Sequence, residues 1–213
     1  MIPNLSLNRP ATLFDLNLAK GKLSFEPQLR FGLDAKPWTF IFWWRYKLVD
    51  SGPFRITAGA HPAFSFKTKS LDNGISTNNY IVVRRYLAGE LYPTYSLTKS
   101  ITTGVYYLYS RGLDFEATRN TNLLALRLSF NNIRLSEKYF AKFLPQVYYL
   151  RMDKLDGTYY TSTLSFARKE FPLSVSSVFC IPFKTSIPQP KEIIWSVSII
   201  YAMNKEYLKK KVN

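Results

Sequence analysis

The sequence has very few of the residues that usually build metal and redox sites. One cysteine, Cys180, and one histidine, His61, occur in 213 residues. A single cysteine excludes an intramolecular disulfide and a thiolate metal cluster, and a single histidine excludes a multi-histidine metal site. We therefore expect no bound metal and no cofactor.

Long hydrophobic runs are also missing. No apolar run approaches the roughly 18 residues of a transmembrane helix. The first residues, MIPNLSLNRPATLFDLNLAKGK, lack a basic start followed by an apolar segment, so no signal peptide is visible in them. We divide the chain into a lead segment over residues 1–21, one domain over residues 22–203, and a basic tail over residues 204–213.

Acidic residues are scarce, with 14 Asp and Glu against 29 Lys and Arg, and the net charge is +15. Basic patches interleaved with aromatic residues can bind single-stranded nucleic acid. The cations of this chain are instead spread over its loops, its polar face and its tail, so we expect no nucleic-acid partner. Aromatic residues make up 16% of the chain, which excludes a disordered protein.

What the sequence does contain is alternation of apolar and polar residues with a period of two, which predicts β-strands. In KLSFEPQLRFGLD, for example, Leu23, Phe25 and Leu29 lie on one face and Ser24 and Gln28 on the other. About ten such segments can be counted (8–12 are possible), and closed bacterial barrels usually have an even number of strands. We expect an all-β fold, namely a closed up-and-down antiparallel transmembrane β-barrel. The segments are 22–34, 38–48, 54–67, 80–97, 101–110, 122–132, 142–151, 159–167, 172–183 and 193–202.

Alternation alone also fits a soluble sandwich or barrel with its apolar face turned inward, one that binds a small apolar ligand. Strand length favours the membrane barrel, because soluble strands average about 5–6 residues and membrane strands need roughly 9–11. The segment Tyr80–Leu97 alternates over its whole length without a strong turn signal. Alternation and strand length leave the soluble alternative open.

The polar face favours the barrel as well, because it carries little charge and several tyrosines. We expect this face to fill a narrow lumen in which carboxylates pair with arginines, since an unpaired buried charge is costly. The expected lumen network is Glu26, Arg30, Arg45, Arg55, His61, Arg84, Glu90, Arg127 and Lys142. Arg85 is the exception, because strict alternation places it on the lipid-facing side, near the outer rim.

Aromatic residues gather near the ends of the expected strands. Trp and Tyr suit a membrane interface because one end of the ring is apolar and the other can be hydrated. The expected interface aromatics are Trp38, Trp44, Tyr46, Tyr109, Tyr149, Trp195 and Tyr201.

The connections alternate in length. VDSGP, TKS, LSEK and EFPL are short, whereas TKSLDNGISTNN, RGLDFEATRNT, RMDKLDGT and KTSIPQPKE are longer and polar. In an up-and-down barrel the short ones fall at one end, as periplasmic turns do, and the long ones fall at the other, where the tight turn DAKP over Asp34 to Pro37 is the exception. Cations at the outer end would meet lipid phosphates and lipopolysaccharide.

His61 and Ser65 suggest a different function, because some outer-membrane barrels are lipid hydrolases with His and Ser on adjacent strands. A nucleophile must lie within hydrogen-bond reach of its base. Residues i and i+4 of one strand are roughly 13 Å apart. We therefore interpret His61 as a lumen or rim histidine, expect no enzyme, and keep a lipid hydrolase as the less favoured alternative.

The phrases GKLSFEPQLRFGLDAKPWTFIFWWRYKL, YLAGELYPTYSLTKSITTGVYYLYSRGLD and NLLALRLSFNN resemble outer-membrane β-barrel proteins of the Bacteroidota. The resemblance covers most of residues 22–203. It lies in the general pattern of residues and not in a signature motif. It implies an outer-membrane location and export through a signal peptide that these residues do not show. We expect a structural barrel, a membrane partner in an envelope complex, or a narrow pore.

Overall fold

The computed structural model describes residues 7, 9–72, 77–188 and 193–203, and these form a single antiparallel β-sheet. No helix in this part of the chain is long and apolar enough to cross a membrane. The strands are β1 (Ala11–Asp15), β2 (Leu18–Lys20), β3 (Leu23–Gly32), β4 (Pro37–Ser51), β5 (Phe54–Asp72), β6 (Thr77–Ser96), β7 (Ile101–Gly112), β8 (Asn120–Arg134), β9 (Tyr139–Met152), β10 (Leu155–Arg168), β11 (Leu173–Thr185) and β12 (Ile194–Tyr201).

The sheet follows the order of the chain. From β3 to β12 each strand pairs with the next one, while β1 and β2 both pair with the other edge of β3. The ten expected segments are therefore all strands, and the all-β up-and-down prediction is confirmed. Two further short strands, β1 and β2, lie within the N-terminal lead segment. The expected tail over residues 204–213 lies outside the described residues.

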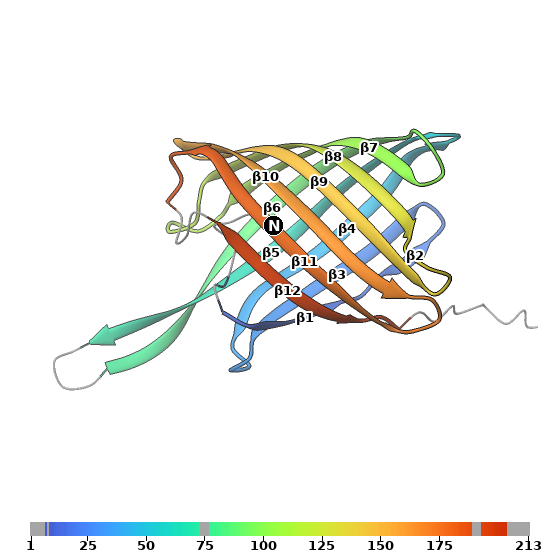
Figure 1. Cartoon of the computed structure of the whole chain (residues 1–213). Helices are drawn as coiled ribbons and strands as arrows, with labels where there is room; N and C mark the ends of the chain where they lie inside the picture. Colours follow the sequence, from blue (N-terminus) through green and yellow to red (C-terminus); the bar gives the residue numbers. More distant parts are fainter. Residues whose placement is uncertain (1–6, 8, 73–76, 189–192, 204–213) are drawn as a thin grey trace, which may run out of the picture.

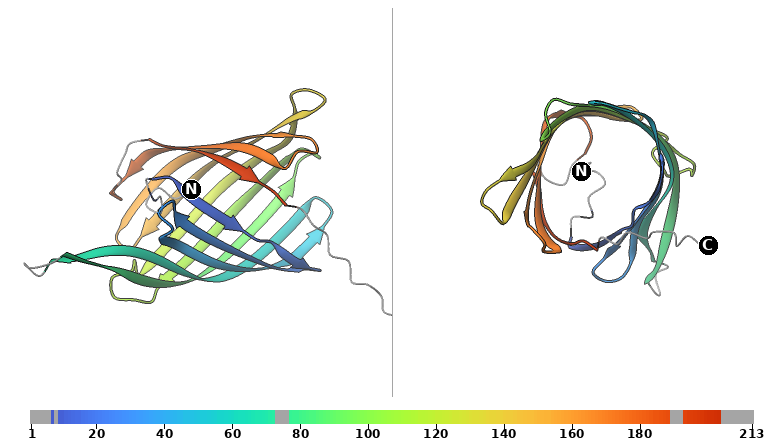
Figure 2. Two further views of the ribbon diagram at one scale, coloured as in Figure 1. Left: turned by 90° about the horizontal axis from the view of Figure 1, so that it is seen from below. Right: turned by 90° about the vertical axis from the view of Figure 1, so that its right-hand side faces the viewer.

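The predicted closure by hydrogen bonds is wrong for the described residues. The sheet rolls around a central axis, which is clearest in the end-on view of Figure 2, but no pairing joins β1 to β12. Both edge strands are short: β1 has 5 residues and β12 has 8. Neither edge therefore offers a long row of backbone groups for a closing ladder. We call this arrangement the rolled sheet and its inside the lumen.

The two ends of the rolled sheet differ. The connections β4–β5, β6–β7, β8–β9 and β10–β11 lie at one end, on the right of Figure 1, which we call the short-turn end. At the opposite, long-loop end the hairpin of β5 and β6 projects beyond the other strands, as Figure 1 shows. The strands β5 and β6 have 19 and 20 residues, so most of the expected loop TKSLDNGISTNN continues the ladder.

The expectation of a long loop at RMDKLDGT is also wrong. Met152 pairs with Leu155, so β9 and β10 are joined by a tight turn over Asp153 and Lys154. Asp153 adopts a positive φ of 54°, which Asp tolerates better than most residues. Its carboxylate also accepts hydrogen bonds from the backbone N–H groups of Arg119 and Asn120. These contacts hold the turn against the neighbouring β7–β8 connection.

The outer face of the rolled sheet carries large apolar side chains that are exposed in every part of the sheet. In β8, Leu124 and Leu126 are exposed, while Leu123 and Ala125, which alternate with them, are buried. In β4, Trp44 is exposed and Trp43 is buried. The alternation seen in the sequence therefore separates an apolar outer face from the lumen.

One side of the lumen is packed with apolar side chains. The rings of Tyr148 and Tyr159 stack at 4.9 Å, and the Tyr148 hydroxyl lies 3.6 Å from the sulfur of Cys180. Ile187, which follows β11, folds inward and packs with Ile194 in the same cluster. The buried members are Tyr106, Leu123, Ala125, Tyr148, Leu150, Tyr159, Cys180, Ile187 and Ile194.

Candidate functional site: a polar cluster in the lumen

Three charged residues from three strands meet on the inner face. Arg45 in β4 donates hydrogen bonds to Glu26 in β3 and to Glu90 in β6, the latter from Nε to Oε1 at 2.5 Å. The Glu90 side chain is only 2% exposed, whereas those of Arg45 and Glu26 are about one quarter and one fifth exposed. A buried carboxylate needs such pairing, because an uncompensated buried charge is strongly destabilising.

A glycine makes this meeting possible. Gly59 of β5 lies opposite both Arg45 and Glu90 and separates their strands. A Cβ atom at Gly59 would lie 2.9 Å from Oε1 of Glu90 and 3.1 Å from Cγ of Arg45. With no side chain there, the guanidinium and the carboxylate can cross over β5.

The cluster continues onto β7 and β8. The Tyr106 hydroxyl donates a hydrogen bond of 2.6 Å to Oε2 of Glu90. The guanidinium carbon of Arg127 lies 3.9 Å from the centre of the Tyr106 ring and 5.3 Å from that of Tyr92. Arg127 also donates from Nε to Oε1 of Gln146 at 2.9 Å. We define the lumen cluster as Glu26, Arg45, Glu90, Tyr106 and Arg127.

His61 lies beside this cluster. Its ring contacts Trp43 with the ring centres 3.7 Å apart, and the guanidinium of Arg45 lies 4.2 Å from the Trp43 ring. Within the described residues, the buried Nδ1 of His61 has no hydrogen-bond partner and no serine hydroxyl bonds to the ring. Ser65 faces Arg84 and Thr39 on the neighbouring strands. The described geometry therefore forms no serine–histidine pair.

A cavity of about 330 Å³ opens next to the lumen cluster. Its position near the short-turn end follows from Lys47 and Thr57, which lie opposite each other close to the β4–β5 turn. The lining residues are Ser24, Glu26, Arg45, Lys47, Thr57, Glu90, Tyr92, Tyr106 and Arg127.

The other expected lumen residues lie elsewhere. Arg30 bonds to Gln28, and its guanidinium lies 5.7 Å from the Trp38 ring. Arg55 pairs with Asp50 near the β4–β5 turn, where both side chains are exposed. Lys142 is exposed and has no ion pair among the described residues. The structure thus brings together four of the nine expected residues, Glu26, Arg45, Glu90 and Arg127, with His61 beside them.

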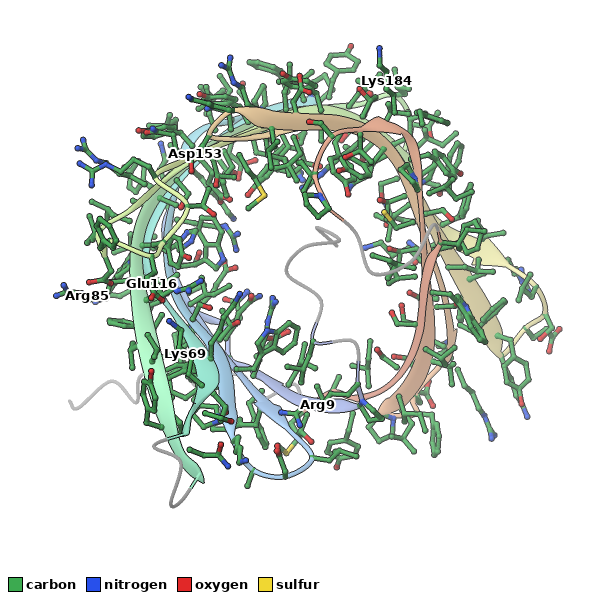
Figure 3. All side chains as sticks on the ribbon, turned by 90° about the vertical axis from the view of Figure 1, so that its left-hand side faces the viewer. Arg9, Lys69, Arg85, Glu116, Asp153 and Lys184 are labelled. Atoms are coloured by element: carbon green, nitrogen blue, oxygen red, sulfur yellow. The ribbon has the colours of Figure 1, made fainter. Side chains whose placement is uncertain are left out.

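A second charged group lies at the long-loop end. Glu116, in the β7–β8 connection, pairs with Lys69 and Arg84, and Asp114 pairs with Arg85. In Figure 3, which views this end, Arg85 projects away from the ring of strands. The hydrogen bonds from Arg85 lower the pKa of Asp114, and those from Lys69 and Arg84 lower the pKa of Glu116. These residues are called the rim ion pairs below.

Of the expected interface aromatics, all but Trp38 are exposed; Trp38 is partly buried, at a register shift between β3 and β4. Three of the exposed rings use their polar atoms. Tyr109 bonds to Asn120, Tyr149 to Asp156, and the indole N–H of Trp195 donates to Ser177. Each ring thus combines an exposed apolar face with a satisfied polar end.

Sequence reasoning missed Tyr106 as a member of the lumen cluster and missed Gly59 and Gln146 as residues that contact it. The alternation of residues 101–110 predicts Tyr106 on the polar, inner face. Its contact with Glu90 depends on the register between β6 and β7, which no sequence feature indicates. No group of three His, Cys, Asp or Glu side chains in the described part could hold a metal ion. Comparison of the chain with protein-family models, with curated proteins and with solved structures gives no match in any of the three.

Proposed function

We propose that this chain is an integral outer-membrane β-barrel protein with a lumen filled by side chains. Its role is structural, or it serves as a membrane partner in an envelope complex. The observation that carries the proposal is the distribution of side chains, with large apolar residues exposed over the outer face and an ion-paired cluster inside.

The outer face supports this proposal because it suits lipid better than water. Soluble monomers rarely expose apolar patches larger than a few hundred Å². Here exposed Leu, Val, Ile, Phe, Tyr and Trp side chains occur on the outer face of nearly every strand, with Ile199 at 77% as an extreme case. A membrane would cover these side chains.

The lumen argues against the soluble alternative. A carrier of a small apolar ligand needs an apolar cavity. The cavity of this protein is lined by two carboxylates, two arginines and a lysine. A water-soluble binder of apolar ligands therefore accounts for neither face of the sheet.

Two further features support a membrane barrel. The strands β3 to β11 have 10 to 20 residues, which meets the roughly 9–11 residues that a tilted membrane strand needs. The connections at the short-turn end have four residues or fewer. The projecting hairpin and the seven-residue β7–β8 connection lie at the other end, together with the tight β9–β10 turn, and longer loops at one end are typical of outer-membrane barrels. Together with the resemblance to barrels of the Bacteroidota, this asymmetry favours an outer-membrane location. In our proposal the long-loop end faces outward, near lipopolysaccharide.

The experiment is to fold the purified chain in detergent and in lipid vesicles and to compare its gel migration in SDS with and without boiling. A membrane barrel keeps its compact form in unheated SDS and shifts on boiling, and the vesicle sample floats in a density gradient. A single gel position at both temperatures, together with a monomer that stays soluble without detergent, would contradict the proposal.

A further inference from the structure

We propose that the lumen cavity binds a small organic anion with a single negative charge, such as a hydroxylated carboxylate. The proposal starts from the cavity of about 330 Å³ beside the lumen cluster. Pockets for small molecules begin at about this volume, so an organic acid the size of one sugar ring fits.

The carboxylates that line the cavity are already satisfied. Glu90 accepts hydrogen bonds from Arg45 and from the Tyr106 hydroxyl. Glu26 accepts them from Arg45 and from the hydroxyl of Ser24, the latter at 2.7 Å. The oxygens of both carboxylates are therefore engaged by Arg45, Ser24 and Tyr106 and are not directed at an incoming ligand.

Two lining cations remain without a carboxylate partner. Within the described ranges, neither Lys47 nor Arg127 forms an ion pair. Counting Glu26 and Glu90 against Arg45, Lys47 and Arg127 leaves the lining with a net charge of +1. A monoanion neutralises this charge, whereas a neutral or cationic ligand does not.

Arg127 is held in place for such a role. Gln146 accepts a hydrogen bond from its Nε, and the ring of Tyr106 supports its guanidinium plane at 3.9 Å. In the part of the chain that the structure describes, its two terminal nitrogens donate to no other residue, so they are available for a bidentate contact with a carboxylate. A pre-positioned arginine loses little conformational freedom when it binds.

The remaining lining groups suit hydroxyls on the ligand. Thr57 lies opposite Lys47 and contributes a hydroxyl, and Tyr92 contributes a phenol. Neither hydroxyl is engaged by another described side chain, so both can donate to or accept from the ligand. Carboxylate recognition by Lys47 and Arg127 and hydroxyl recognition by Thr57 and Tyr92 together indicate a hydroxylated acid.

The experiment titrates glucuronate, with glucose as its neutral counterpart, into the folded full chain in detergent and follows binding by calorimetry at low salt. We expect glucuronate to bind and glucose not to bind. The variants Lys47→Gln and Arg127→Gln should each weaken glucuronate binding roughly tenfold or more, since each removes a charged hydrogen bond. The matched control Arg55→Gln removes a cation at the same end of the sheet that does not line the cavity, and should leave binding unchanged.

Absence of glucuronate binding, equal binding of glucose, or unchanged affinity in both lining variants would overturn the proposal. Lys47 is exposed, so Lys47→Gln tests the site without disturbing the fold. Because the cavity is built by the strands alone, this proposal does not require a membrane location. A failed binding titration therefore contradicts the anion site alone, and a failed gel-shift test contradicts the membrane barrel alone.

Discussion

Arg45 and Glu90 are joined across an intervening strand. Nε of Arg45 in β4 donates to Oε1 of Glu90 in β6 at 2.5 Å, and the contact passes over Gly59 of β5. Arg45 also donates to Glu26, so one guanidinium pairs with two carboxylates. Loss of Arg45 should therefore destabilise the fold more than loss of Glu26 or Glu90 alone.

Replacing Arg45 with methionine should lower the free energy of unfolding by about 3 kcal/mol, because it leaves the carboxylates of Glu26 and Glu90 without their cation. Urea unfolding in lipid vesicles measures the loss. The triple variant Arg45→Met, Glu26→Gln, Glu90→Gln removes all three charges and should recover most of the stability. Equal urea midpoints for wild type and Arg45→Met would contradict this account.

Two glycines on neighbouring strands should respond differently to alanine. A Cβ atom at Gly104 would lie 2.8 Å from the backbone oxygen of Pro93 and 2.9 Å from the Tyr92 ring, whereas one at Gly89 would meet nothing closer than 3.8 Å. We expect Gly104→Ala to cost about 1–3 kcal/mol through overpacking. Gly89→Ala is the matched control and should be close to neutral. Thermal unfolding of the two variants side by side tests the difference.

An arginine on the outer face should impair membrane insertion. Leu126 lies near the middle of β8 and is 58% exposed. In a bilayer, Leu126→Arg should cost about 2–4 kcal/mol, the penalty measured near the midplane of membrane barrels. Leu113→Arg makes the same change in the β7–β8 connection, where the side chain is also exposed, and should be tolerated. Equal yields of folded protein in vesicles for Leu126→Arg and Leu113→Arg would count against a lipid-facing Leu126.

The rim ion pairs should weaken in acid. The pKa of Asp114 lies below its ordinary 3.8 and that of Glu116 below its ordinary 4.5, because Arg85, Lys69 and Arg84 favour the charged forms. A carboxylate with a lowered pKa contributes stability that is fully present above its ordinary pKa and is lost as the pH falls through the lowered value. The rim contacts should thus persist at pH 5 and above and open well below about pH 4.

The Arg85 side-chain Nε resonance in NMR reports this opening. Its chemical shift should change as Asp114 takes up a proton, and Asp114→Asn should remove that change. A resonance that stays constant down to pH 2 in the wild type would show that Asp114 does not titrate against Arg85.

The single cysteine tests whether the lumen is filled. Cys180 is 1% exposed and lies in the apolar cluster against Tyr148. A charged, membrane-impermeant thiol reagent should leave the folded protein unmodified and should label it fully in denaturant. Rapid labelling of the folded protein would indicate a wide water-filled channel beside β11.

The sequence was most informative about strands and faces. Alternation identified β3 to β12 and assigned Trp44 and Trp43 to opposite faces, because side chains of a strand alternate strictly. It was less informative about β1 and β2, whose few residues carry too short a pattern, and about the β9–β10 turn, where pairing continues to Met152 and Leu155. The lumen cluster was anticipated as a set of charges, but its contacts depend on register across strands. A register is set jointly by several turns and bulges, and one sequence does not reveal it.

The strand order also has a consequence for how the protein folds. From β3 onward every strand pairs with the one made just before it, so each hairpin can form after a short loop closes and can add to a growing edge. Such local pairing is fast, because loop-closure entropy rises with the length of the loop. Only a pairing of β12 with β1 would join opposite ends of the chain. No such pairing forms among the described residues, so assembly naturally ends with the addition of β12 to β11. The two short edges, β1 and β12, are then where a folding factor would act with most effect.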